Sequence, residues 1–170
     1  MELFDAIRTK RAIRKFSPTP LPDASVRTIL NAGRRAQSSK NVQAWRFVAV
    51  QNRGTLEALS RCGPYAGHLD GAALGVVILT PDPMGKFQTM FDAGQAAAYM
   101  QLAGWALGIG SCPATLYEAD RVREILGFPD EWHARIGLSF GYPAETADLK
   151  RAPSKGGRAK LSDIVHFERW

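Results

Sequence analysis

The sequence has little of what extracellular or membrane proteins need. Its 170 residues include only two cysteines, Cys62 and Cys112, which lie far apart and outside any C-x-x-C motif. A disulfide scaffold is therefore excluded, and a reducing, cytoplasmic location is expected. The longest apolar run, residues 72–79, has the length of a strand, whereas a bilayer span needs roughly 20 apolar residues. Residues 1–5 lack a basic segment followed by an apolar core, so we expect no export signal.

Residue sets for common kinds of catalysis are also missing. His68, His133 and His166 are scattered without metal-ligand spacing, so no metal site is expected. Neither a Ser-His-Asp set nor a paired-carboxylate site is visible. The Gly-x-Gly at residues 108–110 is not a dinucleotide fingerprint, because Pro113 occupies the place of the third glycine and the motif follows a predicted helix instead of opening one.

What is present fits one ordinary globular domain spanning residues 1–170, with 45% hydrophobic and 22% charged residues. Hydrophobic periodicity predicts helices at 2–9, 24–36 (with Asp23 as N-cap), 55–61, 87 or 92 to 107 (with Asp92 and Gln95 as a capping box) and 119–127. Strands are predicted at 45–50, 73–79 and 135–140, a strand or extended loop at 108–116, a turn at 81–83 and a loop over 144–160. This order indicates an α/β or α+β layered domain and does not choose between a parallel and an antiparallel sheet.

An unusually polar segment, residues 37–44, joins the second predicted helix to the first predicted strand. It contains Ser38, Ser39, Asn41 and Gln43 but no glycine or proline, and Trp45 follows it. A plain connection would use turn-forming residues. Short hydrogen-bonding side chains beside an aromatic ring suit a flat, polar ligand, although a solvated loop anchored by a tryptophan would have the same composition.

The net charge of +6 is concentrated in two places. Ten of the 22 basic residues lie in the acid-free segments 8–15 and 150–160. Such clusters can bind nucleic acid, bind a phosphorylated small molecule, or form a solvated surface. Nucleic acid is disfavoured because the clusters lack interleaved aromatic residues and no helix-turn-helix, zinc-finger or RNA-binding pattern is present.

Five motifs, in order along the chain, resemble those of the nitroreductase family of flavoenzymes in its short, single-domain form. Residues 10–16 (KRAIRKF) resemble its opening Arg-Arg-Ser-Ile-Arg-x-Phe, and residues 38–47 (SSKNVQAWRF) resemble its Ser-Ser-x-Asn-x-Gln-Pro-Trp-x-Phe. Residues 107–112 (LGIGSC), residues 138–145 (LSFGYPAE) and the ending from Arg158 through Leu161 to Trp170 match later signatures.

The resemblance implies an α+β fold in which helices flank an antiparallel sheet. It also implies an intertwined homodimer whose C-terminal tail, about residues 161–170, adds a strand to the partner's sheet. Two FMN molecules would lie at the dimer interface. The implied activity is hydride transfer from NADH or NADPH, through flavin N5, to a small electron-poor acceptor such as a nitroaromatic or a quinone, without nucleic acid or membrane as a partner.

The resemblance also assigns residues to the flavin. Lys10, Arg11 and Ala12 would follow its phosphate, ribityl and pyrimidine side. Arg14 would lie near the N1–C2 edge, where a guanidinium stabilises the negative charge that reduction brings. The remaining candidates are Pro113, Ala114 and Thr115 over the ring with a backbone N–H near N5, Arg158 with Lys160 or Lys155 at the phosphate, and Ser38, Ser39 and Asn41 from the partner subunit.

This chain departs from the family pattern at several of these positions. Ala12 replaces a serine and removes a side-chain hydrogen bond, Lys10 replaces an arginine and cannot form a bidentate fork, and Ala44 and Gln37 stand where prolines are usual. Three alternatives stay open: the same fold with another flavin reaction, such as flavin destruction or dehalogenation; a flavin-binding protein without turnover; and a basic nucleic-acid-binding domain.

Overall fold

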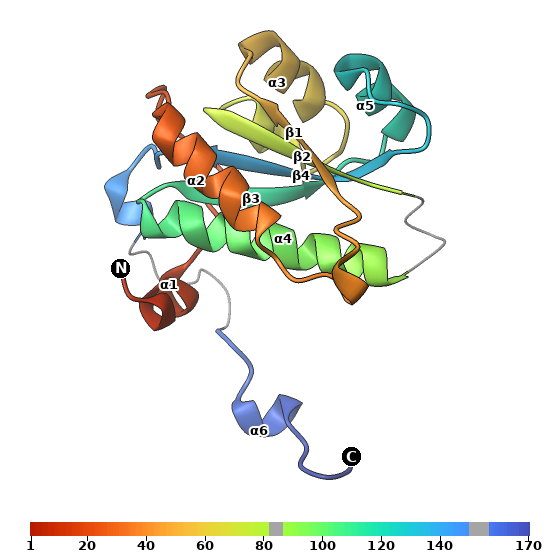
Figure 1. Cartoon of the computed structure of the whole chain (residues 1–170). Helices are drawn as coiled ribbons and strands as arrows, with labels where there is room; N and C mark the ends of the chain where they lie inside the picture. The colour runs from red at the N-terminus through yellow and green to blue at the C-terminus, as the bar shows by residue number, and fades with distance from the viewer. Residues whose placement is uncertain (82–86, 150–156) are drawn as a thin grey trace.

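A four-stranded antiparallel sheet forms the centre of the fold, seen here in a computed structural model that describes residues 1–81, 87–149 and 157–170 (Figure 1). Its strands are β1 (Arg46–Val50), β2 (Leu74–Thr80), β3 (Gly110–Thr115) and β4 (His133–Gly141), in the order β1-β2-β4-β3. Every neighbouring pair is antiparallel. The α+β class with an antiparallel sheet is therefore confirmed, and the ambiguous segment at 108–116 is a strand.

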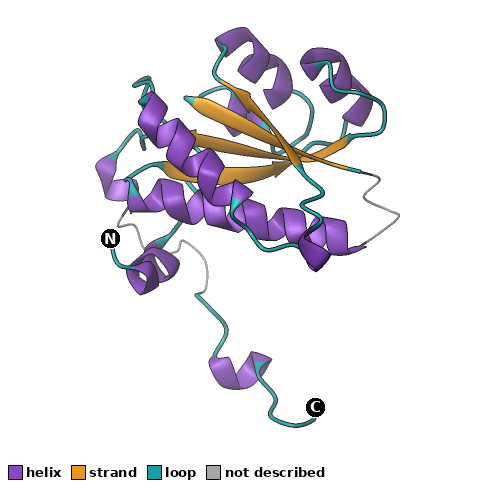
Figure 2. Ribbon diagram, in the orientation of Figure 1, coloured by secondary structure: helices purple, strands orange, loops and turns teal. Residues whose placement is uncertain are grey.

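Helices cover both faces of the sheet (Figure 2). Helices α2 (Asp23–Arg34) and α4 (Phe87–Ala106) enclose one core against the sheet, and α3 (Arg53–Ser60) and α5 (Ala119–Leu126) enclose another on the opposite face. All seven residues of β2 are buried, which explains its unbroken apolar run. Helices α2 and α4 approach closely at Gly33, where a Cβ would lie 2.1 Å from the Met100 methyl group.

Helix α1 (Leu3–Thr9) packs near the end of α4. Ala6, Ile13 and Trp105 form a small third core there, and the Trp105 indole donates to the Thr9 hydroxyl at 2.9 Å. Helices α1 to α5 and the four strands begin and end within two residues of their predicted bounds, with α4 starting at the earlier of its two predicted positions. The single helical turn at Leu161–Ile164 was not predicted. Short 3-10 turns η1 (Ser39–Asn41), η2 (Gly67–Leu69) and η3 (Thr146–Leu149) were not predicted, and η3 replaces part of the loop expected after residue 144.

Both predicted acidic helix caps are wrong. Pro22 is the N-cap of α2, Asp23 is the first helical residue, and no side chain caps this end. Helix α4 is already helical at Phe87, so Asp92 lies inside it and cannot form a capping box with Gln95. The Asp92 carboxylate instead accepts a tertiary hydrogen bond, which local spacing cannot reveal. Of the turn expected at 81–83, only Pro81 lies within the described residues. Lys155 lies outside them.

The C-terminal tail lies away from the rest of the fold (Figure 1). It contains α6 (Leu161–Ile164), a single helical turn, followed by chain without a further helix or strand to residue 170. Its large apolar side chains are exposed, with Phe167 at 82% and Trp170 at 99%. In this isolated chain the tail is therefore not a strand, and its exchange with a partner stays a prediction.

Candidate flavin site

Basic residues from the two ends of the chain come within electrostatic range of each other beside β3. The Lys10 ammonium donates to the Gln101 side-chain oxygen on α4 at 2.7 Å. Burial lowers the pKa of Lys10, the nearby Cys112 sulfur opposes that shift, and the Arg158 guanidinium lowers the pKa further. Arg158 is thus close enough to act on Lys10, although 147 residues separate them. The fold therefore brings Arg158 of the C-terminal basic segment within electrostatic range of Lys10 of the N-terminal one.

Arg14 belongs to the same neighbourhood. Burial raises the pKa of the Cys112 thiol on β3, and the Arg14 and Lys10 cations beside it oppose that rise. Ala12 forms an isolated parallel bridge with Ser111, and the Ile13 N–H donates to the Ser111 carbonyl at 3.0 Å. Residues 10–14 therefore lie along the first half of β3.

Arg11 has one buried polar atom without a partner. Its Nη1 donates to the Arg8 and Lys10 carbonyls at 3.1 and 3.0 Å, which holds the guanidinium in place. Its Nε is buried and has no hydrogen-bond partner among the described residues. Because buried donors are normally satisfied, this atom is a candidate contact for a bound acceptor.

The second half of β3 presents a backbone donor on its outer edge. In an antiparallel ladder, successive residues direct their N–H and C=O groups alternately toward the partner strand and away from it. The Leu116 N–H donates to the Arg135 carbonyl, so the backbone N–H and C=O of the preceding residue, Thr115, point away from β4. The Ser111 carbonyl, four residues earlier, also points away from β4 and accepts from Ile13. The Thr115 N–H thus faces away from β4, and its side chain and that of Pro113 are exposed whereas Ala114 is buried.

A glycine shapes this edge. A Cβ at Gly63 would lie 2.4 Å from the Thr115 carbonyl oxygen, so only glycine lets the chain after α3 approach so closely. The loop that contains Gly63 therefore packs directly against the Thr115 carbonyl.

The polar segment 37–44 lies at the other end of α4. The Ser39 N–H donates to the Asp92 carboxylate at 2.9 Å. Gln43 organises the rest of the segment: its N–H donates to the Ser38 hydroxyl at 2.9 Å, and its side-chain amide donates to the Asn41 side chain at 3.2 Å. The segment is thus a built structure and not a plain solvated loop.

Its backbone is strained. Lys40, Asn41 and Gln43 have φ values of 52°, 56° and 51°, in the left-handed region that disfavours residues with a Cβ. Asparagine tolerates this region, but lysine and glutamine gain nothing from it locally. Strain of this kind persists only where surrounding contacts fix it, and it gathers at binding sites.

The candidate residues therefore form two groups within one chain. Asp92 holds the group at Ser38, Ser39 and Asn41, and Gln101, which holds Lys10, comes nine residues later in α4. At 1.5 Å per residue, roughly 14 Å of helix separates the two anchors. One chain does not bring the two groups together.

Asp92 and Gln101 were not predicted as site residues. Both are buried polar side chains in a helix that is otherwise rich in alanine, glycine and apolar residues. That interruption of the apolar pattern was the available signal. Lys160 is exposed on the chain that leads to α6, and no described contact joins it to the site.

No helix in the described ranges is long and apolar enough to cross a membrane. In those same ranges, no three His, Cys, Asp or Glu side chains gather as metal ligands.

Comparison with known proteins gives consistent results over most of the chain. The model of the nitroreductase family matches residues 7–65 and 57–142. An NADH dehydrogenase from Thermus thermophilus is 31% identical, with 80% of this chain and 84% of the relative covered. The nitroreductase NfnB from Mycolicibacterium smegmatis is 28% identical over 96% and 91%. The structure of an FMN-dependent nitroreductase from Clostridium difficile R20291 superposes with a TM-score of 0.82, at 27% identity, over 98% of this chain and 99% of that one.

Proposed function

We propose that this chain, which belongs to the nitroreductase family, is a single-domain FMN-dependent oxidoreductase. It would pass a hydride from NADH or NADPH, through flavin N5, to an electron-poor acceptor such as a nitroaromatic or a quinone. The observation that carries the proposal is that Lys10 and Arg14 lie beside β3, whose Thr115 N–H faces outward, with Arg158 within electrostatic range of Lys10.

These residues fit FMN chemically. A phosphate monoester with a charge near −2 favours paired cationic donors, which Lys10 and Arg158 supply, with Lys160 as a further cation nearby in sequence. The orphaned Arg11 Nε offers a buried donor to the ribityl or pyrimidine side. When bound, the flavin supplies the two-electron redox chemistry.

The protein's part is to position charges. Arg14 would lie at the N1–C2 edge and stabilise negative charge there, and the Thr115 N–H would donate to N5. Pro113 would form the surface beneath the ring, with the backbone of the buried Ala114 beside it. Ala12 offers no side-chain donor, so the backbone and the arginines carry the binding at this point.

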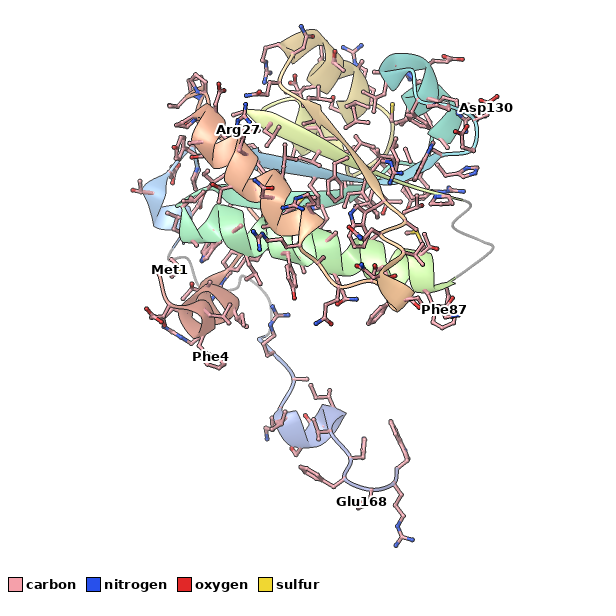
Figure 3. All side chains as sticks on the ribbon, in the orientation of Figure 1. Met1, Phe4, Arg27, Phe87, Asp130 and Glu168 are labelled. Carbon is pink, nitrogen blue, oxygen red and sulfur yellow. The ribbon has the colours of Figure 1, made fainter. Side chains whose placement is uncertain are left out.

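A homodimer completes the site in this proposal. Since roughly 14 Å of α4 separates the Lys10 group from Ser38, Ser39 and Asn41, a second copy can supply the latter group. Exposed apolar side chains are available for such an interface, including those of Phe4 and Phe87, which point away from the body of the fold in Figure 3.

The tail would strengthen the same interface. β3 carries the bridge from Ala12 on its outer edge, whereas β1 is the other edge strand of the sheet. The exposed tail of a partner, with Phe167 and Trp170, could pair along β1 and cover apolar surface there. This arrangement is the intertwined dimer that the family resemblance implies.

The proposal is tested by following NADH and NADPH oxidation with and without a nitroaromatic and a quinone acceptor. FMN-dependent oxidation of a nicotinamide that speeds up with either acceptor is expected. Bound flavin without oxidation would favour a non-catalytic flavin protein, and oxidation coupled to flavin loss would favour a flavin-destroying reaction. A colourless protein that binds DNA or RNA would overturn the proposal.

A further inference from the structure

His68 is a buried titratable side chain packed against β4, the strand next to β3. It lies in η2, against the sheet face that α3 and α5 cover, and is only 9% exposed. Its Nδ1 is 2.8 Å from the hydroxyl of Ser139, which is fully buried on β4 and lies opposite Cys112 of β3. His68 is therefore linked through one side chain to the residue that precedes Pro113.

We assign the tautomer of His68 from the hydrogen bonds of Ser139. The Ser139 hydroxyl lies 3.3 Å from the Cys112 carbonyl, to which it can only donate. With its single proton given to that carbonyl, the hydroxyl accepts from His68, so that Nδ1 carries the ring proton and Nε2 carries the lone pair. Nε2 is buried and has no partner among the described residues, which leaves a free proton-accepting position.

The surroundings keep His68 neutral. Burial lowers its pKa, and the Arg14 cation lowers it further, whereas the Pro113 backbone favours the protonated form. The charged or titratable groups on η2 and the elements around it include Arg14, Lys10, Cys112, Cys62, His133 and Arg135 of β4, the ion pair Arg53–Asp70 and the ion pair Glu57–Arg61. Among them, Arg14 is the one whose charge acts on the pKa of His68.

We propose that His68 is a redox-linked proton acceptor, neutral while the flavin is oxidised and protonated at Nε2 when the flavin is reduced. This rests on the proposed function, in which Arg14 lies at the N1–C2 edge. Negative charge placed beside Arg14 offsets the guanidinium's field, and that field is one of the two factors opposing protonation of His68. His68 acts through Arg14 and is a positioning residue, since it does not contact the reacting atoms.

Reduction of a bound flavin by NADH or NADPH would break the C4–H bond of the nicotinamide and form the N5–H bond, so that the nicotinamide is oxidised and the flavin gains two electrons. A separate proton from solvent would form the Nε2–H bond of His68. One additional proton is thus taken up for each pair of electrons.

The test is the pH dependence of the flavin midpoint potential in the FMN-loaded protein. One proton for two electrons changes the equilibrium constant tenfold per pH unit, which corresponds to about 30 mV per pH unit. We expect wild type to show this additional slope between the pKa values of His68 in the two redox states. His68→Asn keeps a donor for Ser139 but cannot be protonated, so it should lose the additional slope, whereas His133→Asn on β4 should retain it.

Equal slopes in wild type and His68→Asn, with FMN bound to both, would overturn the proposal while leaving the proposed function intact. Should His68→Asn fail to fold, ¹⁵N NMR of the wild-type imidazole decides: Nε2 is expected to be unprotonated with oxidised and protonated with reduced flavin, and an unchanged signal overturns the proposal. Failure of wild type to bind FMN would remove the proposed function and this inference with it.

Discussion

Asp92→Ala is a direct perturbation of the strained segment that holds half of the candidate site. Asp92 is 6% exposed, and its carboxylate accepts from the Ser39 N–H at 2.9 Å. This bond ties the polar segment 37–44 to α4 and helps to hold the left-handed residues Lys40, Asn41 and Gln43. Without it, the segment is expected to relax toward less strained backbone angles.

The size of the effect follows from the surroundings of the bond. A hydrogen bond to a charged group contributes about 1.5–3 kcal/mol to stability. The Ser39 residue is exposed, so water can replace the lost acceptor, and removal of a buried carboxylate recovers part of its desolvation free energy. We therefore expect a decrease of about 1.5 kcal/mol in the free energy of unfolding, at the lower end of that range.

FMN affinity should respond at least as strongly, because Ser38, Ser39 and Asn41 would have to be ordered again on binding. About 1.4 kcal/mol corresponds to a tenfold higher Kd. Urea unfolding and FMN titration measure the two effects. Asp92→Asn keeps an acceptor and should lose roughly half as much stability and FMN affinity as Asp92→Ala. Thr89→Ala, which truncates a buried polar residue one turn earlier, is the control for side-chain truncation in α4. Unchanged stability and affinity in Asp92→Ala would refute this account of the segment.

Three further predictions test other parts of the structure. Arg158→Ala should weaken FMN binding by about 1.5–3 kcal/mol, while Arg61→Ala, at the residue that follows α3, should not; an unchanged FMN titration in Arg158→Ala would place the phosphate elsewhere. Deletion of residues 161–170 should dissociate or unfold the dimer, and a truncated protein that sediments as a stable dimer would contradict tail exchange. Since the pKa of folded His68 is lowered from 6.5, the unfolded state binds more protons just below that pH, so stability should fall as pH drops through this window. Urea unfolding at several pH values should show a smaller fall in His68→Asn, and an equal fall would contradict the assignment.

Much of the fold could be predicted because the local patterns agree with the tertiary structure. The apolar run of β2 predicts a strand, and the small residues of α4, such as Ala96 and Gly104, predict a helix in close contact with other elements. The wrong caps at Asp23 and Asp92 have a common cause. An acidic residue near a helix start suits several roles, and only the tertiary structure shows that Asp92 binds Ser39.

The candidate site was only partly predictable. Motifs identified the basic segments and the polar segment, but their placement depends on pairings that local sequence does not encode. The contact of Lys10 with Gln101 and the proximity of Arg14 to Cys112 and His68 arise from the position of β3 at the sheet edge. The separation of Ser39 from Lys10 along α4 likewise emerges only from the fold.

The central claim is that this chain holds FMN, and an absorbance spectrum of the purified protein after FMN addition and desalting tests it most directly. Retained bands near about 370 and 450 nm, the absorption of oxidised flavin, are the predicted result. A colourless protein after incubation at micromolar FMN would contradict the claim and would mean that the cations beside β3 hold something else.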